Sequence, residues 1–335
     1  MKRVTVLGST GSIGVSTLNV LARHPDRFAV RALAAANSVE ALAAQTKQHD
    51  PDRVVVADGG APIEALHEAG ARSLTQGRDA LLDLCEDPET DVLVNAVVGA
   101  AGLEPTLRGL SAGKRVALAN KESLVAAGPL VLQAREAGGG ELVPIDSEHS
   151  AILQCIEGYD ANDVERIVLT ASGGPFRGWK PEAVRAATPS DALKHPTWEM
   201  GAKITVDSAT LANKALEVIE AHVLYGVSYD QIEVVVHPQS IVHSFVEFRD
   251  GSVMAQLGFP TMELPILYAL SYPERIADKT LTTFDPVRCS PLTFEPVDGD
   301  AFPLLSAGIN AGRAGGTAPA VFNAANEVAV RAFLG

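Results

Sequence analysis

The sequence has few cysteines, and none is paired at a metal-binding or redox spacing. The three residues are Cys85, Cys155 and Cys289, and none belongs to a CxxC motif. An odd number of widely spaced cysteines argues against a disulfide framework. Reduced thiols are typical of the cytoplasm, so a cytoplasmic location is expected.

Long apolar runs and an excess of basic residues are also absent. No run approaches the roughly 18 apolar residues of a membrane-spanning helix, and the N-terminal apolar run is too short for a signal peptide. The chain has 27 Lys and Arg against 41 Asp and Glu, a formal net charge of -14. An acidic protein repels phosphate backbones, so neither a membrane nor a nucleic acid is expected as a partner. A small anionic substrate would need a local cationic site.

What the first part of the chain does have is regular alternation of apolar strands and helical stretches. Such alternation predicts βαβ units and a parallel sheet, and hence an α/β fold. The expected strands are 4–7, 29–34, 54–57, 91–97 and 116–119, and the clearest expected helices are 15–22, 38–48 and 63–69.

The pattern changes near residue 145. Strands are expected at 166–170 and 233–236, and Asp250-Gly251 predicts a hairpin between 241–249 and 252–257. This part is typical of an α+β domain. Residues rich in Pro and Thr predict a linker, and a helix is expected at 319–334. The predicted division is therefore 1–145, 146–271, a linker at 272–297, and 298–335.

A glycine loop follows the first predicted strand and precedes a helix. Gly8, Gly11 and Gly14 have the spacing GxxGxxG. Glycines let a backbone approach a pyrophosphate, and a helix N-terminus attracts its charge. A plain tight turn is the alternative. The end of the second strand, 32–37, has no acid to bind a ribose hydroxyl, which favours NADP over NAD, although it has no Arg or Lys either.

Two acidic segments predict a divalent metal site. Asp146 and Glu148 alternate in a strand-like stretch and would share one face, and paired carboxylates suit a hard cation. In a predicted helix, Asn213 and Lys214 could bind a phosphate while Glu217 completes the metal site. The alternatives are a solvated acidic turn and an ordinary Lys–Glu pair on a helix.

Two loops have chemical content of a weaker kind. Residues 170–176 form a Ser- and Gly-rich loop, which is either an anion site or a plain turn. Residues 195–201 contain His, Trp and Met between Pro and Gly, which is typical of a lid, although a core-packed Trp is the alternative. For His149, His237 and His243, taken singly, a structural role is the better interpretation.

The motifs occur in a specific order. GSTGSIG is followed by VGAAGLEPTL, ALANKESLV, PIDSEHSAI, TASGGPF, HPTWEMGAKITVDSATLANKALEVIEA, VHPQSIVHS and NAANEVAV. This order, from Val4 to the end of the chain, resembles the 1-deoxy-D-xylulose 5-phosphate reductoisomerase family.

The resemblance implies a fold, a reaction and its cofactors. The fold would be α/β, with an N-terminal Rossmann-like NADPH-binding domain, an α+β connective and catalytic domain, and a truncated C-terminal helical domain. The enzyme would be a homodimer that uses NADPH and Mg²⁺ or Mn²⁺. It would rearrange and reduce a small phosphorylated sugar, 1-deoxy-D-xylulose 5-phosphate, to 2-C-methyl-D-erythritol 4-phosphate in the non-mevalonate isoprenoid pathway.

The resemblance also implies roles for individual residues. The metal ligands would be Asp146, Glu148 and Glu217, and these three with Lys121 would be catalytic. The substrate would be bound by Lys121, Ser147, Glu148, Ser172, His195, Ser208, Asn213, Lys214 and Glu217. NADPH would be bound by Thr10, Gly11, Ser12, Ile13, Asn37, Asn120, Glu122 and Gly201. Trp198 and Met200 would lie on a flap.

One departure and two rival interpretations accompany this resemblance. Ala35-Ala36 stands where the family often has Gly-Lys or Gly-Arg, so the usual cation at the 2'-phosphate is not expected there. A semialdehyde or homoserine dehydrogenase also joins a Rossmann domain to an α+β domain, and a semialdehyde dehydrogenase would need a nucleophilic Cys. The other rival is a catalytically impaired, truncated NADP-binding relative.

Overall fold

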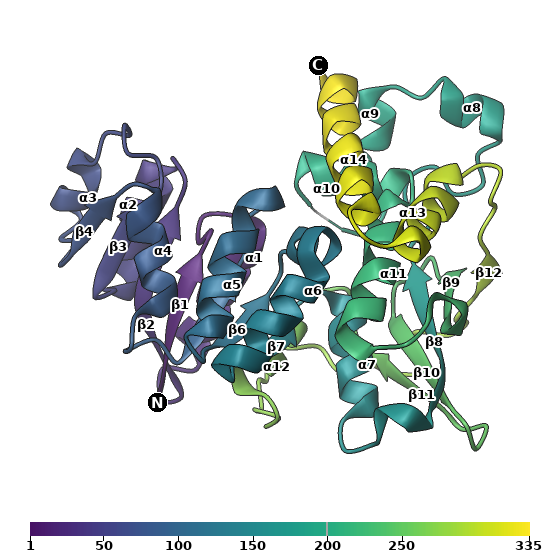
Figure 1. Cartoon of the computed structure of the whole chain (residues 1–335), viewed down its shortest axis with the longest axis horizontal. Coiled ribbons are helices and arrows are strands. Elements are labelled where there is room, and N and C mark those ends of the chain that lie inside the picture. The colour runs from purple at the N-terminus through teal and green to yellow at the C-terminus, as the bar shows by residue number, and fades with distance from the viewer. Residues whose placement is uncertain (199) are drawn as a thin grey trace. The chain divides into compact units, whose positions relative to one another are not determined.

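The chain folds into two compact units, which are described separately below. The computed structural model describes residues 1–198 and 200–335. The first unit comprises residues 1–123, 127–146 and 262–281, and the second comprises 124–126, 147–261 and 282–335 (Figure 1). Among the described residues, no helix is both long and apolar enough to cross a membrane.

The first unit is built on a seven-stranded parallel sheet. Its strand order is β4-β3-β2-β1-β5-β6-β7. The order reverses between β1 and β5, and in open α/β sheets ligands bind at such a reversal, beyond the carboxyl ends of the strands. The strands are β1 Lys2–Leu7, β2 Phe28–Ala35, β3 Arg53–Val56, β4 Leu74–Gln76, β5 Val92–Asn95, β6 Arg115–Leu118 and β7 Glu141–Pro144.

Helices connect these strands and cover the sheet. A parallel sheet buried on both faces needs strands that are apolar almost throughout, and Val4, Val6 and Leu7 are fully buried. The helix α6 is kinked at Ala127, which has a non-helical φ of -147°. The helices are α1 Ser12–Arg23, α2 Val39–His49, α3 Glu64–Glu68, α4 Arg78–Glu86, α5 Leu103–Ser111, α6 Lys121–Gly138 and α12 Glu263–Ser271, with a 3-10 turn at Gly99–Gly102.

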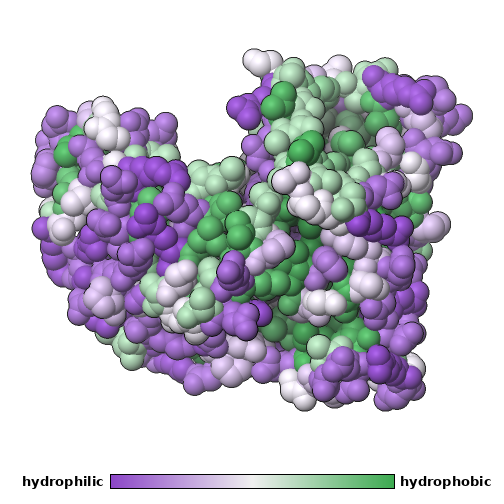
Figure 2. All heavy atoms as spheres, in the orientation of Figure 1, coloured by the Kyte–Doolittle hydropathy of each residue, from purple (hydrophilic) through white to green (hydrophobic). Residues whose placement is uncertain are grey.

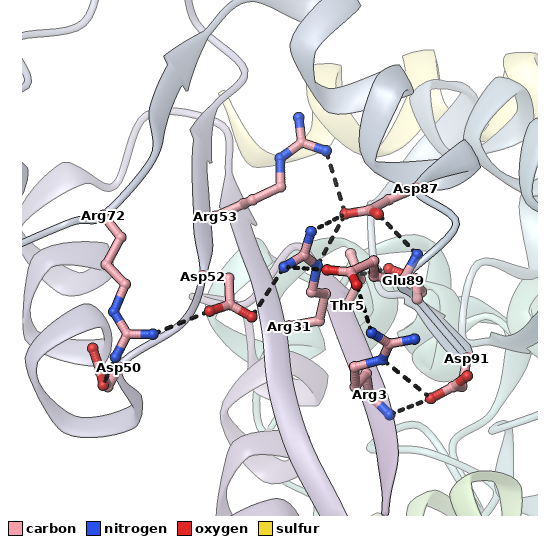
Figure 3. A network of polar contacts seen from close by, with 11 residues as sticks. Arg3, Thr5, Arg31, Asp50, Asp52, Arg53, Arg72, Asp87, Glu89 and Asp91 are labelled. Atoms are coloured by element: carbon pink, nitrogen blue, oxygen red, sulfur yellow. Dashed lines mark hydrogen bonds and ion pairs between the residues drawn. The ribbon is translucent and has the colours of Figure 1, made fainter.

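A network of arginines and acids joins the first three strands of this unit (Figure 3). Arg31 of β2 lies 3.0 Å from Asp87 and 3.0 Å from Asp52, and Arg53 of β3 lies 3.4 Å from Asp87. Burial raises the pKa of the Asp87 carboxyl, but the Glu89 backbone N–H and the two guanidiniums outweigh burial and leave the pKa below its usual range. The network therefore stabilises the ionised form of Asp87.

The second unit is built on a five-stranded mixed sheet of order β11-β10-β8-β9-β12. The strands are β8 Val164–Ala171, β9 Ile232–Val236, β10 Val242–Phe248, β11 Val253–Leu257 and β12 Glu295–Pro296. Only β8 and β9 pair in parallel. Its core contains Ile152, Ile167, Leu169, Val218 and Val246, contributed by the sheet and by two helices.

Helices of the second unit pack on this sheet and on one another. α7 contacts β10 and β11, α11 contacts β8 and β9, and α13 and α14 extend the helical layer from α11 (Figure 1). On the face shown in Figure 2, hydrophobic residues gather over α14, whereas the surface over α4 is largely hydrophilic. The helices are α7 Ser147–Ile156, α8 Pro181–Arg185, α9 Pro189–Ala192, α10 Ala202–Ala209, α11 Ala212–Tyr225, α13 Pro303–Ala314 and α14 Ala318–Leu334, with 3-10 turns at Ala161–Asp163 and Tyr229–Gln231.

The structure confirms the α/β class, the parallel sheet and the hairpin, and corrects three expectations. Glu148 lies in the first turn of α7 rather than in a strand, because β7 already ends at Pro144. Residues 262–271, expected in the second domain, belong to the first unit, because the buried helix α12 packs on α1. Residues 298–335, expected to begin a separate domain, pack within the second unit through α11.

Candidate functional site

The three predicted metal ligands converge. Ligand atoms of Asp146, Glu148 and Glu217 all lie within 4.8 Å of one another. Glu148 opens α7 and Glu217 lies in the middle of α11. Asp146 directly precedes the segment of the second unit that begins at Ser147. It is only two residues from Glu148 in the chain, and this short connection keeps the two carboxylates near each other. Oxygens that share one cation at about 2.0–2.6 Å cannot be much more than about 5 Å apart, so the spacing fits a single ion.

Two lysines accompany the carboxylates. Lys214 Nζ contacts Glu217 and lies 3.6 Å from Glu148 Oε2, and Lys214 and Glu217 are 5% and 1% exposed. Lys121 Nζ donates to Asp146 Oδ2 at 2.6 Å. Three carboxylates and two ammonium groups leave one formal negative charge in a largely buried place. An all-oxygen donor set with excess negative charge fits a hard divalent cation such as Mg²⁺ or Mn²⁺.

The helix α11 also places Asn213 at this cluster. Its amide Nδ2 donates to Glu217 Oε1, while Lys214 contacts Oε2 of the same carboxylate. The Lys–Glu pair considered as an alternative is thus present, but it is buried rather than on a solvated face. Phosphate binding by Asn213 and Lys214 stays a prediction.

Neighbouring side chains orient Glu148. Ser147 Oγ donates to Glu148 Oε2 at 3.0 Å, and His243 Nδ1, on β10, lies 3.7 Å from Glu148 Oε1. His243 is 4% exposed. A structural role was expected for His243 from the sequence. The sequence feature that could have pointed to this site was the position of His243 in the motif VHPQSIVHS.

A second group of predicted residues meets where β8 ends. Ser172 Oγ lies 3.0 Å from His195 Nε2 and accepts the Gly174 N–H at 3.2 Å. Gly174 has a φ of +63°, and a Cβ there would lie 2.6 Å from the Ser208 carbonyl oxygen. Glycine is therefore required for the loop to approach α10, and the close approach brings the Ser172 loop to the helix that carries Ser208.

The hydrogen bonds of His195 fix its tautomer. Its Nδ1 accepts the backbone N–H groups of Thr197 and Trp198 at 3.1 and 2.9 Å. The proton is therefore on Nε2, which donates to Ser172 Oγ. Burial lowers the pKa of His195, so the ring is neutral at pH 7. Trp198 and Met200 are half-buried, and residue 199 between them lies outside the described residues.

Ser208 is adjacent to a buried carboxylate that has a partner on each oxygen and to which the sequence assigned no role. Asp207, 1% exposed, accepts from Asn326 Nδ2 of α14 at 2.7 Å and lies 2.8 Å from Lys203 Nζ. The only sequence signal was that Asp207 and Asn326 both belong to motifs in the ordered set. α14 is thereby attached to the helix that carries Ser208.

In the first unit, the predicted cofactor residues lie at the carboxyl ends of the strands. Thr10 and Gly11 lie in the turn between β1 and α1, and Ser12 and Ile13 begin α1. A Cβ on Gly14 would lie 2.3 Å from the Gly8 carbonyl oxygen, so the turn requires glycine. No side chain caps α1, whose first N–H groups are available to a phosphate. Asn37 is exposed just after β2.

Asn120 and Glu122 are placed differently from these exposed residues. Asn120 is 2% exposed, donates to Val97 and Gly99 carbonyls, and caps α6 through Ser123 N–H. Glu122 is 8% exposed in the same first turn. These contacts give Asn120 a structural role, and its binding to a cofactor stays a prediction, as does that of Glu122 and of Gly201, the N-cap of α10.

Family models match nearly the whole chain. Residues 4–128 match a model described as 1-deoxy-D-xylulose 5-phosphate reductoisomerase, 142–225 match its C-terminal domain, and 257–335 match a DXP reductoisomerase C-terminal domain. The chain belongs to the 1-deoxy-D-xylulose 5-phosphate reductoisomerase family.

Individual members of the family show the same relation. The chain is 52% identical over 338 residues to the reductoisomerase of Gloeobacter violaceus, covering 100% of this chain and 86% of that protein. It is 51% identical over 341 residues to that of Laribacter hongkongensis, covering 100% and 88%.

Solved structures extend the comparison to the fold. A DOX-P reductoisomerase in complex with NADPH, fosmidomycin and magnesium has a TM-score of 0.95 at 41% identity, covering 100% of this chain and 85% of that one. The Zymomonas mobilis reductoisomerase in complex with NADPH has a TM-score of 0.92 at 43% identity, covering 99% and 86%. A putative homoserine dehydrogenase from Archaeoglobus fulgidus has a TM-score of 0.50 at 14% identity, which shows a shared fold alone.

Proposed function

We propose that the chain catalyses the NADPH- and divalent-metal-dependent rearrangement and reduction of 1-deoxy-D-xylulose 5-phosphate to 2-C-methyl-D-erythritol 4-phosphate, a reaction of non-mevalonate isoprenoid synthesis. The observation that carries this proposal is the convergence of Asp146, Glu148 and Glu217 within 4.8 Å, in a chain that belongs to the reductoisomerase family. The fosmidomycin and NADPH complexes of its relatives support the same chemistry.

The acidic cluster has the chemical requirements of the rearrangement step. The three carboxylates would hold Mg²⁺ or Mn²⁺, with Ser147 keeping Glu148 oriented. When bound, the ion supplies Lewis-acid stabilisation of negative charge that develops on substrate oxygen. Lys121 holds a proton at Nζ beside Asp146 and would donate a hydrogen bond to a substrate oxygen.

The second unit also offers hydrogen-bond donors for the substrate phosphate. Ser172, Ser208, Asn213 and Lys214 would bind the phosphate, and the neutral His195 presents its Nε2–H toward Ser172. The backbone N–H groups of Thr197 and Trp198 donate hydrogen bonds to His195 Nδ1. Substrate binding at His195 would therefore also order the start of the flap, where Trp198 lies. The phosphate is remote from the reacting carbons, and its binding energy can be used in this way to close the flap.

The first unit would bind NADPH. The N–H groups at the start of α1 face the pyrophosphate in this proposal, with Thr10 and Gly11 in the turn, Ser12 and Ile13 at the start of the helix, and Asn37 near the adenosine ribose. Ala36 offers no charge to the 2'-phosphate, so the preference for NADPH over NADH is expected to be smaller than in relatives with a cation there.

The rival functions lack support from the site. Cys155 is 3% exposed within an apolar core, and burial raises the pKa of the Cys85 thiol to about 12, so neither thiol is a suitable nucleophile. The intact carboxylate cluster does not favour a catalytically impaired relative.

A homodimer and a cytoplasmic location are part of the same proposal. Strand β11 forms an edge of the second sheet, and Val253 and Met254 on it are 57% and 37% exposed. An exposed apolar edge strand is suited to pairing with another chain. The free thiols of Cys85, Cys155 and Cys289 suit a reducing compartment.

The test is incubation of the chain with 1-deoxy-D-xylulose 5-phosphate, NADPH and Mn²⁺, following NADPH absorbance and identifying the product. We expect oxidation of NADPH that stops when EDTA is added and resumes with excess Mn²⁺. NADPH oxidation that is indifferent to EDTA, or a product with an unrearranged carbon skeleton, would contradict the proposal.

A further inference from the structure

A buried histidine and a buried glutamate connect the two helices that carry the metal ligands of the second unit. His149 of α7 and Glu220 of α11 are 0% and 1% exposed, and His149 Nε2 lies 3.0 Å from Glu220 Oε2. Neither side chain has a part in the chemistry proposed above. Two polar groups this deep in a hydrophobic interior are costly to bury, and packing alone would be served better by apolar residues.

A second contact connects the same helices at the same residue. Tyr225, at the end of α11, donates its hydroxyl to the His149 carbonyl oxygen at 2.6 Å. The rings of His149 and Tyr225 also lie near each other, with centroids 6.1 Å apart. The side chain of His149 therefore lies against α11, and its backbone carbonyl oxygen accepts a hydrogen bond from that helix.

These contacts lie next to the metal ligands along both helices. Glu148 directly precedes His149, and Glu217 lies three residues before Glu220, about one helical turn away. Ser244 of β10 donates to the Glu148 carbonyl oxygen at 3.0 Å and holds the same turn of α7 from the sheet. The contact between α7 and α11 at His149 therefore lies within about one helical turn of both carboxylates.

We propose that Glu220 and Tyr225 are positioning residues for the metal site, acting through His149 to hold Glu148 at the distance from Glu217 that one divalent ion requires. This inference rests on the proposed function only in assigning a metal to the acidic cluster. Residues that orient metal ligands typically change metal affinity by about 10–100-fold when they are removed. Replacing either residue should therefore weaken the metal before it harms the fold.

The experiment measures Mn²⁺ affinity of the whole chain by electron paramagnetic resonance of free Mn²⁺, without substrate or NADPH. Tyr225→Phe removes only the hydroxyl, and Glu220→Gln removes only the charge. Both should raise the dissociation constant of Mn²⁺ roughly tenfold, and excess Mn²⁺ should restore turnover. Tyr159→Phe is the matched control, because Tyr159 lies in the same unit, is 55% exposed and should bind Mn²⁺ like the unchanged chain.

Two further measurements separate this inference from the proposed function. Glu217→Gln tests the metal site itself: unchanged Mn²⁺ affinity in that variant would overturn both the site and the positioning role. If Glu217→Gln weakens Mn²⁺ but Tyr225→Phe does not, the positioning role alone is overturned. Thermal unfolding monitors the fold; should Glu220→Gln prove unfolded, the result from the milder Tyr225→Phe decides the question.

Discussion

The two units contain charged clusters of opposite character. In the first unit, Arg31 and Arg53 alternate with Asp52 and Asp87, and outer members are well exposed, such as Arg72 at 54% (Figure 3). In the second unit, Glu148 and Glu217 meet Lys214 where side chains are 15% exposed or less, and Asp146 adds a further carboxylate. In the first arrangement the carboxylates are distributed among several guanidiniums, whereas in the second three carboxylates converge on one point.

This difference separates a structural network from a reactive one. A carboxylate flanked by guanidiniums has its lone pairs used by the protein, and its contribution is to stability. Carboxylates that converge on one point repel one another, and a bound metal ion removes that cost, so their arrangement reflects a ligand. Substitutions in the two clusters should therefore have effects on different measurements.

The largest expected effect follows replacement of a metal ligand. Because loss of an orienting neighbour alone costs about 10–100-fold, Glu217→Gln should weaken Mn²⁺ binding by at least about 100-fold. Unfolding by urea should be little affected, because Lys214 keeps Glu148 as a partner at 3.6 Å. Loss of Mn²⁺ binding together with a large loss of stability would instead make the cluster a structural network like that of the first unit.

The complementary change is made in the first unit. Asp87→Asn removes the buried carboxylate shared by Arg31 and Arg53 and should lower the free energy of unfolding by roughly 3 kcal/mol, with Mn²⁺ affinity unchanged. Arg72→Ala is the control, since an exposed ion pair contributes at most about 1 kcal/mol. Urea titrations measure the free energy of unfolding of both variants. Equal losses of stability would show that burial does not determine how much an ion pair contributes.

The pH dependence of this effect has a definite sign. The folded pKa of Asp87 is below its unfolded value, so the stabilisation is present above the unfolded pKa of about 4 and is lost as pH falls toward the folded pKa. The difference in stability between the unchanged chain and Asp87→Asn should therefore shrink below about pH 4.

Lys214→Ala distinguishes substrate binding from metal binding inside the acidic cluster. Losing a charge-assisted contact to the phosphate costs roughly 1.5–3 kcal/mol, so the KM for the sugar phosphate should rise about tenfold to a hundredfold. Mn²⁺ affinity should hold or improve, because Lys214 competes for the Glu217 carboxylate. Steady-state kinetics and Mn²⁺ titration check the two quantities, and an unchanged KM would place the phosphate elsewhere.

His195 gives a smaller effect that depends on pH. Its folded pKa is lowered by burial, so the neutral ring and its acceptance of the Thr197 and Trp198 N–H groups persist below the ordinary His pKa of about 6.5 and fail only at lower pH. The KM should therefore rise on the acid side. The substrate phosphate titrates near pH 6 as well, so the unchanged chain is compared with His195→Gln. In that variant, the part of the fall in kcat/KM at low pH that is due to protonation of His195 should vanish. Coincident profiles of kcat/KM would contradict this role.

The smallest effect concerns the uncharged cofactor loop of the first unit. A lysine in place of Ala36 adds a cation at an exposed position after β2 and should lower the KM for NADPH several-fold, of the order of one charge-assisted hydrogen bond, while that for NADH stays nearly constant. Parallel titrations with both nucleotides measure this. If the two constants move together, position 36 does not lie near the 2'-phosphate.

Local sequence patterns predicted the fold where the signal was itself local. Most strands of the parallel sheet were predicted because buried strands are apolar almost throughout, as at Val4–Leu7, whereas the short β4, Leu74–Gln76, was missed. The strand-like interpretation of Glu148 was wrong, because alternation over three residues cannot distinguish a strand from the start of a helix. The placement of 262–271 was wrong because only packing on α1 assigns α12 to the first unit.

The candidate site shows the same limit. Residue types suggested Asp146, Glu148 and Glu217 as metal ligands but left alternatives open. The ordered motifs were needed to join them, since residues about 70 positions apart in the chain share no local pattern. The contacts of Asp207 with Asn326 and of His149 with Glu220 and Tyr225 were not predicted. Such contacts depend on how helices pack, and the sequence shows each partner only as an ordinary polar residue.

The most direct test of the acidic cluster is a crystal structure of the chain soaked with Mn²⁺, with the ion located by its anomalous scattering. We predict one ion bound by oxygens of Asp146, Glu148 and Glu217 at about 2.0–2.6 Å. An ion held elsewhere, or a Glu217 carboxylate more than about 8 Å from the other two in the presence of Mn²⁺, would contradict it.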